Sequence, residues 1–216
     1  MIFGDRHVAG IQLARKLKRY RNARPLVLAI PRGGVPIAAV IAERLAGELD
    51  TLFVGKLGSP YNEEFAIGSV DEAGNANLFG NPPLVGPIAD YIDREKARQM
   101  QIMRGRRAVY TPNRQAADPR GRVTILVDDG LATGATLLAA LQSVRRKGPA
   151  RLIVAVPVAS VEGLAKLSKQ ADEMAYLAAP EHFLAVSQFY RHFPELSDED
   201  VIAALRAIND RRSHLH

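Results

Sequence analysis

The stretch Val127–Thr136 reads VDDGLATGAT and continues directly from the apolar run VTILV over Val123–Val127. A short aliphatic run without polar alternation predicts a strand buried on both faces, as in a parallel sheet. Two adjacent carboxylates at the end of such a strand are costly to bury, and this end is where open α/β sheets bind ligands. The stretch therefore predicts both a fold class and the place of a site.

Further apolar runs extend this reading to the rest of the chain. They cover Leu26–Ile30, Leu52–Val54 and Leu152–Val156, with a weaker one at Met174–Leu177. Helical patterns lie between these runs, and strands that alternate with helices are typical of the α/β class. We expect a mainly parallel central sheet flanked by helices.

Three of the expected helices have clear end signals. The first covers about 135–147 and is ended by Gly148-Pro149. The second begins after Gly34, and Ser197 is a good N-cap for a third near the C-terminus.

The interval 57–87 interrupts this alternation. Its glycines, asparagines and prolines predict a loop or a small hairpin, and Ile88–Val109 then predicts a charged helix. A long loop inside a compact domain is usually a lid or a binding loop. We expect one domain over 1–216, with a core at about 24–56 and 120–180, a flexible loop and helix at about 57–119, and a hood and C-terminal helix at about 180–212.

Composition excludes several function classes. The 216 residues are 47% hydrophobic and 24% charged, as in a folded soluble protein. The absence of cysteine excludes disulfides, thiol catalysis and zinc bound by sulfur, and the five histidines show no metal-binding spacing. Apolar stretches stay well short of the ~18 residues of a membrane span, and the N-terminus lacks the pattern of a secretion signal. We expect a cytoplasmic protein without a membrane partner.

The net charge of +6 is regional, because residues 94–122 hold nine basic residues and only two acidic ones. Such a region can meet nucleic acid, an anionic membrane or a phosphorylated small molecule, or it can be a solvated helix face or a dimer surface. No helix-turn-helix pattern or RNA-binding aromatic motif accompanies it. We therefore do not expect nucleic acid as a partner of this protein.

Residues 130–136 combine small side chains, hydroxyls and backbone N–H groups at a helix N-terminus, which is an anion site suited to phosphate. The stretch lacks the lysine of a Walker A loop, and no GxGxxG occurs in the chain. A ligand that presents hydroxyls to Asp128 and Asp129 and a phosphate to these amides would resemble ribose 5-phosphate.

An acidic pair followed by a T-G-x-T turn resembles the phosphoribosyl pyrophosphate motif of type I phosphoribosyltransferases. The resemblance implies that Asp128 and Asp129 bind the ribose hydroxyls, support Mg²⁺ and take part in catalysis. It also implies that the following turn wraps the 5-phosphate. The residues of that turn are Gly130, Leu131, Ala132, Thr133, Gly134, Ala135 and Thr136.

A second motif, IPRGGV at 30–35, resembles the pyrophosphate loop of the same family. Arg32 would face the departing pyrophosphate, and Gly33 and Gly34 would let the backbone approach it closely. Lys56 stands at the end of the second expected strand, from which the family directs a cation toward the active site.

Other stretches resemble a poorly characterised bacterial branch of the family: FGDR at 3–6, EFAIGSV at 64–70 and FYRHFPELSDEDV at 189–201. Within them Glu64 either orients a substrate or is a surface glutamate. In the hood, Phe183 and Tyr190 either stack on the acceptor or pack in the core. Ala132 replaces an aspartate of the 6-oxopurine enzymes, which disfavours hypoxanthine and guanine.

The resemblance implies a magnesium-dependent pentosyltransferase, expected as a homodimer. It would transfer 5-phosphoribosyl from phosphoribosyl pyrophosphate to a nitrogenous, nucleobase-like acceptor and release pyrophosphate. The alternative is a regulator without catalysis, which senses phosphoribosyl pyrophosphate and binds nucleic acid or a protein partner.

Overall fold

The computed structural model describes residues 2–79, 87–112 and 114–213, without the side chains of 62–66 and 209–213. Its contacts divide the chain into two compact units. Unit 1 comprises 1–52 and 114–216, and unit 2 comprises 53–113. None of the described helices is both long and apolar enough to cross a membrane.

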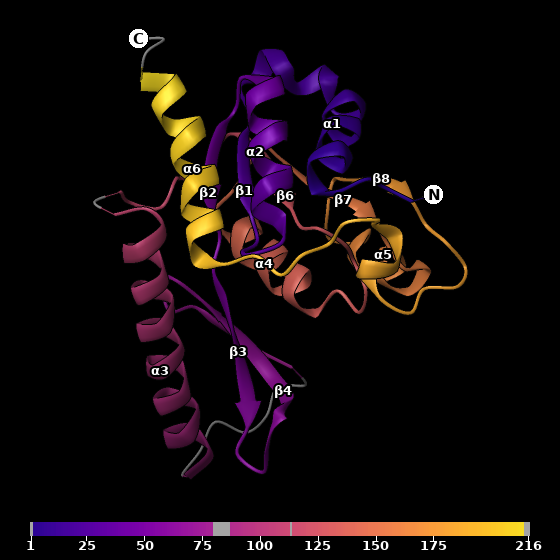
Figure 1. Cartoon of the computed structure of the whole chain (residues 1–216). Coiled ribbons are helices and arrows are strands. Elements are labelled where there is room, and N and C mark those ends of the chain that lie inside the picture. Colours follow the sequence, from indigo (N-terminus) through magenta and orange to yellow (C-terminus); the bar gives the residue numbers. More distant parts are fainter. Residues whose placement is uncertain (1, 80–86, 113, 214–216) are drawn as a thin grey trace. The chain divides into compact units, whose positions relative to one another are not determined.

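Unit 1 is built on a five-stranded parallel sheet (Figure 1). The strand order is β2-β1-β6-β7-β8. The strands are β1 (Leu26–Ala29), β2 (Glu48–Thr51), β6 (Val123–Val127), β7 (Arg151–Val158) and β8 (Glu173–Ala178). The expected α/β class with a parallel central sheet is confirmed, and β1, β6, β7 and β8 lie where the apolar runs predict them.

Helices follow the strands as the end signals predict. Gly34 opens α2, Ser197 caps α6 by accepting a hydrogen bond from the Asp200 N–H, and α4 ends at Arg146. The helices of unit 1 are α1 (Arg6–Lys16), α2 (Gly34–Leu45), α4 (Ala135–Arg146), α5 (Val161–Leu167) and α6 (Asp198–Ser213), with short 3-10 helices η1 (Lys18–Ala23) and η2 (Val186–Phe189).

The strand order places a topological switch point between β1 and β6. From β1 the chain continues outward to β2, and from β6 it continues outward in the opposite direction to β7. Right-handed crossovers therefore place α2 and α4 on opposite faces of the sheet. Ligands of open α/β sheets bind at the carboxyl ends of the strands that flank such a point.

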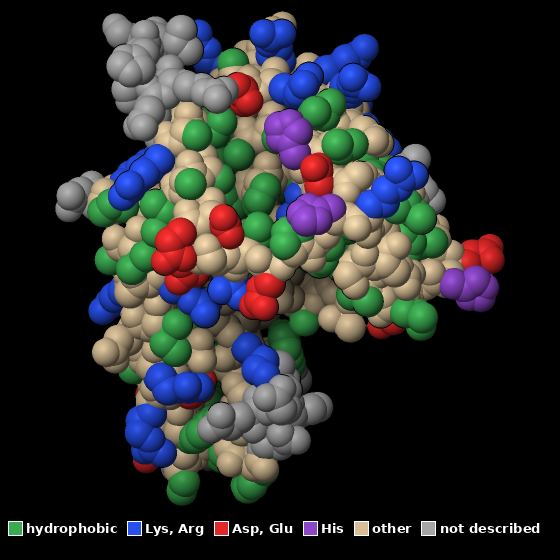
Figure 2. Space-filling model, viewed as in Figure 1, with side chains coloured by type: hydrophobic (Ala, Val, Ile, Leu, Met, Phe, Trp, Pro, Cys, Tyr) green, Lys and Arg blue, Asp and Glu red, His purple; other side chains and the backbone are tan. Residues whose placement is uncertain are grey.

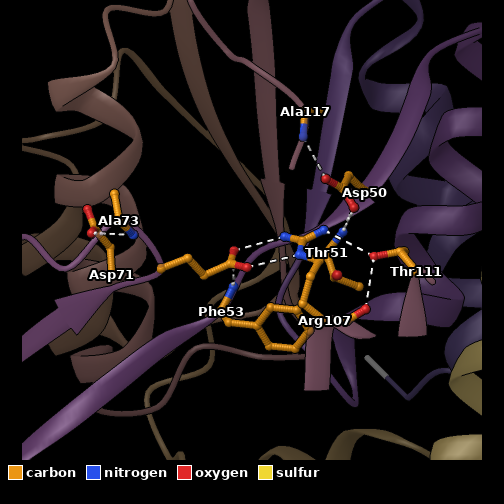
Figure 3. Close-up of polar contacts among 9 residues, drawn as sticks. Asp50, Thr51, Phe53, Asp71, Ala73, Arg107, Thr111 and Ala117 are labelled. Carbon is orange, nitrogen blue, oxygen red and sulfur yellow. Dashed lines mark hydrogen bonds and ion pairs between the residues drawn. The ribbon is translucent and has the colours of Figure 1, made fainter. Parts of the chain in front are cut away.

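One expected strand was wrong in its position and its sheet. Leu52–Val54 is the junction between β2 and β3 (Val54–Ser59), and the strand of the central sheet is ELDT at 48–51. The sequence did not predict β2 because Glu48 and Asp50 are polar, and the residues that bind their side chains are distant in sequence. Asp50 accepts hydrogen bonds from the N–H groups of Thr51 and Ala117 (Figure 3).

Unit 2 is a three-stranded antiparallel sheet with one long helix, and its β3-β4 hairpin lies where the sequence predicts a loop or a small hairpin over 57–87. The strand order is β3-β4-β5, with β4 at Asn62–Asp71 and β5 at Ala76–Leu78. The helix α3 (Pro87–Tyr110) packs on β3 and β4 and confirms the charged helix.

A partly buried ion pair links the helix and the sheet of unit 2. Arg107 donates two hydrogen bonds, of 2.9 and 2.8 Å, to the carboxylate of Glu72 (Figure 3). The guanidinium also lies 5.2 Å from the centre of the Phe53 ring. These contacts join α3 to the first residue of the unit and to the turn after β4.

A cluster of one carboxylate and two arginines holds β2 in unit 1. Glu48 accepts hydrogen bonds of 2.8 Å from both Arg114 and Arg122. Burial opposes ionisation of Glu48, but the hydrogen bonds and charges of the two arginines outweigh it and lower the pKa of the carboxyl.

We predict that Glu48→Gln lowers the free energy of unfolding by about 1–2 kcal/mol at pH 7. Since the pKa of Glu48 is lower in the folded chain than in the unfolded one, its contribution is present above ~4.5 and is lost as the pH falls through the folded-state pKa. Urea unfolding between pH 3.5 and 7 measures it, with the exposed Glu181→Gln as control. A difference that does not shrink toward low pH would contradict this account.

Candidate functional site

The predicted acidic pair occupies the turn at the end of β6. The Asp128 carboxylate accepts a 2.9 Å hydrogen bond from the N–H of Asp129. Burial, and secondly the negative charge of Asp129, raise the pKa of Asp128 well above its usual range. Burial also raises the pKa of Asp129, and Arg6 partly offsets that rise. Ionisation of both carboxylates in this turn therefore lowers the free energy of unfolding.

Arg6, at the start of α1, is the cation of this site, and the sequence reading did not assign it. Its Nε and Nη2 each lie 3.0 Å from Asp129 Oδ2, and Nη1 donates a 2.9 Å hydrogen bond to the Pro194 carbonyl. The guanidinium lies 3.7 Å from the centre of the Phe193 ring. One buried side chain therefore joins the acidic turn to the hood. The FGDR stretch was the signal that could have found it.

The hood aromatics expected at the acceptor have identifiable contacts. Tyr190 donates a 2.7 Å hydrogen bond to the backbone carbonyl of Asp129 and packs against Phe3 and Phe193. Burial, and secondly the charge of Asp129, raise the pKa of Tyr190, so its hydroxyl remains a donor. Phe183 packs on Phe189 in the adjoining apolar cluster. The aromatic ring that lines a cavity here is that of Phe193.

The Arg32-Gly33-Gly34 loop lies against the acidic turn so closely that only glycine fits. A Cβ on Gly33 would stand 2.0 Å from Asp129 Oδ2, and one on Gly34 would stand 2.5 Å from the Val127 carbonyl oxygen. The peptide between Pro31 and Arg32 is cis. The structure therefore brings the two sequence motifs together at the switch point.

A cavity of about 330 Å³ lies between this loop and the hood. Its charged side chains are Arg6, Arg32, Asp129 and Glu195, and Arg32 donates a 2.9 Å hydrogen bond to Glu195. Because 43% of the Arg32 side chain and 88% of the Glu195 side chain are exposed, water screens this pair and an anion can replace Glu195. The cavity is completed by Gly33, Phe193, Pro194 and Leu196.

A second cavity, of about 170 Å³, adjoins Asp128, whereas the first adjoins Asp129. It is lined by Asp128, Val186 and the whole of 130–137. Gly134 is the N-cap of α4 with φ of +74°, so no side chain caps the first N–H groups of that helix. Ser160 fixes the outer edge of the loop by donating a 2.6 Å hydrogen bond to the Ala132 carbonyl. An uncapped helix N-terminus beside a cavity is suited to a phosphate.

The remaining candidates, Lys56 and Glu64, belong to unit 2. Lys56 lies inside β3, paired with Ser69 of β4, so the expectation that it ends a strand of the central sheet was wrong. Glu64 is part of β4, and its side chain lies outside the described residues.

The acidic pair supplies few ligands of its own for a metal. Within the described part of the chain, no group of three or more His, Cys, Asp or Glu side chains could hold an ion. Mg²⁺ prefers six oxygen ligands and commonly takes one or two carboxylates together with phosphate oxygens and water. Asp128 and Asp129, with only Arg6 to offset them, fit a cation that arrives with a phosphorylated ligand.

Comparison with known proteins agrees with this geometry. Residues 6–193 match the family described as the phosphoribosyl transferase domain, and the chain belongs to this family. A Mycobacterium tuberculosis (strain H37Rv) protein named "Putative phosphoribosyl transferase Rv0571c" is 38% identical over 208 residues, which are 94% of this chain and 46% of that protein. This chain thus spans just under half the length of that relative.

Solved structures give the same picture. The crystal structure of TT1426 from Thermus thermophilus is 45% identical and has a TM-score of 0.85, with 95% of this chain and 98% of that one covered. A hypothetical protein from Neisseria gonorrhoeae, solved with bound ppGpp, is 13% identical with a TM-score of 0.51, over 96% and 98% of the two chains. The second likeness is one of fold alone. The fold is that of the type I phosphoribosyltransferases.

We predict that Asp128→Asn stabilises the protein by about 1–3 kcal/mol at pH 8 in the presence of EDTA. The pKa of Asp128 is higher in the folded chain than in the unfolded one, so wild-type stability falls as the pH rises through that interval. The asparagine side chain removes this fall and can still accept the Asp129 N–H.

Guanidinium unfolding at pH 4.5 and 8 measures the effect. Asp172→Asn is the matched control of opposite sign, because the hydrogen bond from Arg145 lowers the pKa of Asp172. A variant that is no more stable than the wild type at pH 8 would show that the acidic turn carries no such cost.

Proposed function

We propose that this chain is a Mg²⁺-dependent phosphoribosyltransferase that uses phosphoribosyl pyrophosphate and a nitrogenous, nucleobase-like acceptor. One observation carries the proposal: the acidic pair lies between two cavities of different chemistry. One cavity borders an uncapped helix N-terminus, and the other contains Arg32 and the glycine loop. A phosphate, a ribose and a pyrophosphate joined in that order match this arrangement.

Each part of the donor has an assigned place in this proposal. The 5-phosphate binds at 133–136, the ribose hydroxyls donate to Asp128 and Asp129, and the pyrophosphate meets Arg32 beside Gly33. In the reaction, the bond between the anomeric carbon and the pyrophosphate oxygen breaks, and a bond to the acceptor nitrogen forms. The transition state resembles an oxocarbenium ion, so the protein contributes by positioning the reactants and stabilising charge on the leaving group. Mg²⁺ held by the acidic pair would offset the negative charge of the pyrophosphate.

The first prediction concerns binding of the donor. At ~100 times the dissociation constant, phosphoribosyl pyrophosphate with Mg²⁺ adds roughly 2.7 kcal/mol of stability, or about 5–11 °C in the unfolding midpoint. The double variant Asp128→Asn with Asp129→Asn should remain folded and lose this shift. Thermal unfolding with and without Mg²⁺ measures it, and ribose 5-phosphate is the control ligand. A full shift of the unfolding midpoint in the double variant would show that the ligand does not bind at Asp128 and Asp129.

The second prediction separates the two cavities. Arg32→Gln should weaken the binding of phosphoribosyl pyrophosphate by about 10–100-fold, since a charge-assisted contact to the pyrophosphate is lost. The affinity for ribose 5-phosphate should change by less than about 2-fold. Glu195→Gln should act in the opposite direction, because it removes the nearer of the two carboxylates, Glu195 and Asp198, that pair with Arg32. Calorimetric titration of both variants decides this. Equal weakening of both ligands by Arg32→Gln would place Arg32 outside the pyrophosphate site.

Catalysis is tested separately from binding. Pyrophosphate release is followed with a panel of purines, pyrimidines and other nitrogen heterocycles in the presence of the donor and Mg²⁺. Release that depends on one acceptor, and that is lost in the double aspartate variant, supports the transferase. Donor binding without release across the panel would favour the regulator.

A further inference from the structure

The edge of unit 1 opposite the site is strongly basic. In a parallel sheet every strand begins at one edge, and a strand of five residues places that edge about 16 Å from the other. The segments that lead into the five strands are 15–26, 43–48, 118–123, 144–151 and 166–173. Together they contain fifteen Lys and Arg residues and five Asp and Glu residues. We call this set of segments the basic edge.

The densest part of the basic edge follows α1. No Asp or Glu occurs anywhere from Arg6 to Ala42. Six cations lie in 15–24, and all six are exposed: Arg15, Lys16, Lys18, Arg19, Arg21 and Arg24. Side chains three residues apart align along a 3-10 helix, so η1 places Lys18 and Arg21 in one row. Figure 2 shows Lys and Arg side chains gathered at the top of the view, over α1 and α2.

Three of the five carboxylates of this edge are already paired with arginines. Glu173 accepts hydrogen bonds from Arg19, Tyr20 and Arg151. Asp172 pairs with Arg145, and Glu48 pairs with Arg114 and Arg122.

Four cations therefore remain uncompensated. Among the described residues, no carboxylate lies within ion-pair distance of Arg15, Lys18, Arg21 or Arg24. Helix dipoles favour a few cations at the ends of α2 and α4. They do not account for the row that extends beyond α1 through η1.

We propose that the basic edge binds nucleic acid through its phosphate backbone. Ten of its fifteen cations are arginines, which suit phosphate oxygens better than lysines do. None of the described large apolar side chains that are exposed belongs to it, whereas membrane-binding faces insert such residues. Its one aromatic side chain, Tyr20, is buried, so bases have no stacking platform there.

The proposal goes beyond the proposed transferase and does not depend on it. The basic edge and the two cavities lie at opposite ends of the strands, so nucleic acid and a phosphorylated sugar can bind at the same time. Contacts to phosphates alone give affinity without sequence preference and a strong dependence on salt.

The test uses the full chain and fluorescently labelled 20-nucleotide RNA, single-stranded DNA and duplex DNA. Anisotropy titrations between about 50 and 200 mM salt give the affinity and its salt slope. The variant Arg15→Gln, Lys18→Gln, Arg21→Gln should weaken binding at least ~10-fold and reduce the slope by about 2–3, since each phosphate contact contributes roughly 0.7–0.9. The three nucleic acids distinguish an RNA partner from a DNA partner.

The matched control removes three exposed arginines from α3: Arg94→Gln, Arg104→Gln, Arg106→Gln. It changes the net charge equally, and we expect less than ~2-fold weakening. Equal weakening by both variants would show that net charge, rather than this edge, governs binding. The proposal would also be overturned by a wild-type affinity independent of salt, or by tighter binding to phosphatidylserine vesicles than to any nucleic acid.

Two further variants separate charge from folding. The charge-conserving variant Arg15→Lys, Lys18→Arg, Arg21→Lys should bind within ~2-fold of the wild type. A second neutral variant on other segments of the edge, Arg120→Gln, Lys147→Gln, Lys169→Gln, should weaken binding several-fold. If the second neutral variant folds with an unchanged unfolding midpoint and binds like the wild type, the basic edge is not the binding surface.

Discussion

The pair formed by Arg6 and Asp129 is the contact on which the site depends. Two adjacent carboxylates at the end of β6 repel each other, and burial disfavours their charge. Among the described residues, Arg6 is the one cation that contacts Asp129, and the same guanidinium binds the Pro194 carbonyl and covers Phe193. The Arg6 guanidinium therefore holds the first turn of α1 and the hood next to the acidic turn, where we propose that the ligand binds.

The position of the Asp129 side chain restricts which residues can occupy the loop after β1. The loop after β1 passes so near Asp129 that a Cβ at Gly33 would overlap its carboxylate, and Tyr190 holds the backbone of the turn from the hood. Binding elements from three distant parts of the chain thus meet at one switch point of the sheet. Burial of two neighbouring carboxylates costs stability in the free protein, and local stability is given up where a ligand binds.

Patterns local in sequence predicted most of unit 1, and long-range pairing explains what they missed. Apolar runs located β1, β6 and β7, and the motifs after β1 and β6 predicted the loops that meet. ELDT was missed because Glu48 and Asp50 are satisfied by residues more than sixty positions away. Arg6 was missed for the same reason, since its partner is Asp129. In unit 2, β3 and β4 carry glycines and polar residues between their apolar ones, so the sequence left a loop and a hairpin open, and the contacts with α3 are distant in sequence.

The parallel topology itself separates the charges of unit 1. All helices that follow a strand begin at the site edge, where their N–H groups and positive dipole ends suit an anion, and they end at the opposite edge, where cations are favoured. The acidic pair, Glu195 and the first turn of α6 add negative charge at the first edge, and η1 adds positive charge at the second. The six exposed cations within 15–24 exceed the charge of helix dipoles, which is about half a charge per helix end. Lys16 and Arg19 have partners in the fold, and the proposed polyanion site rests on the other four cations.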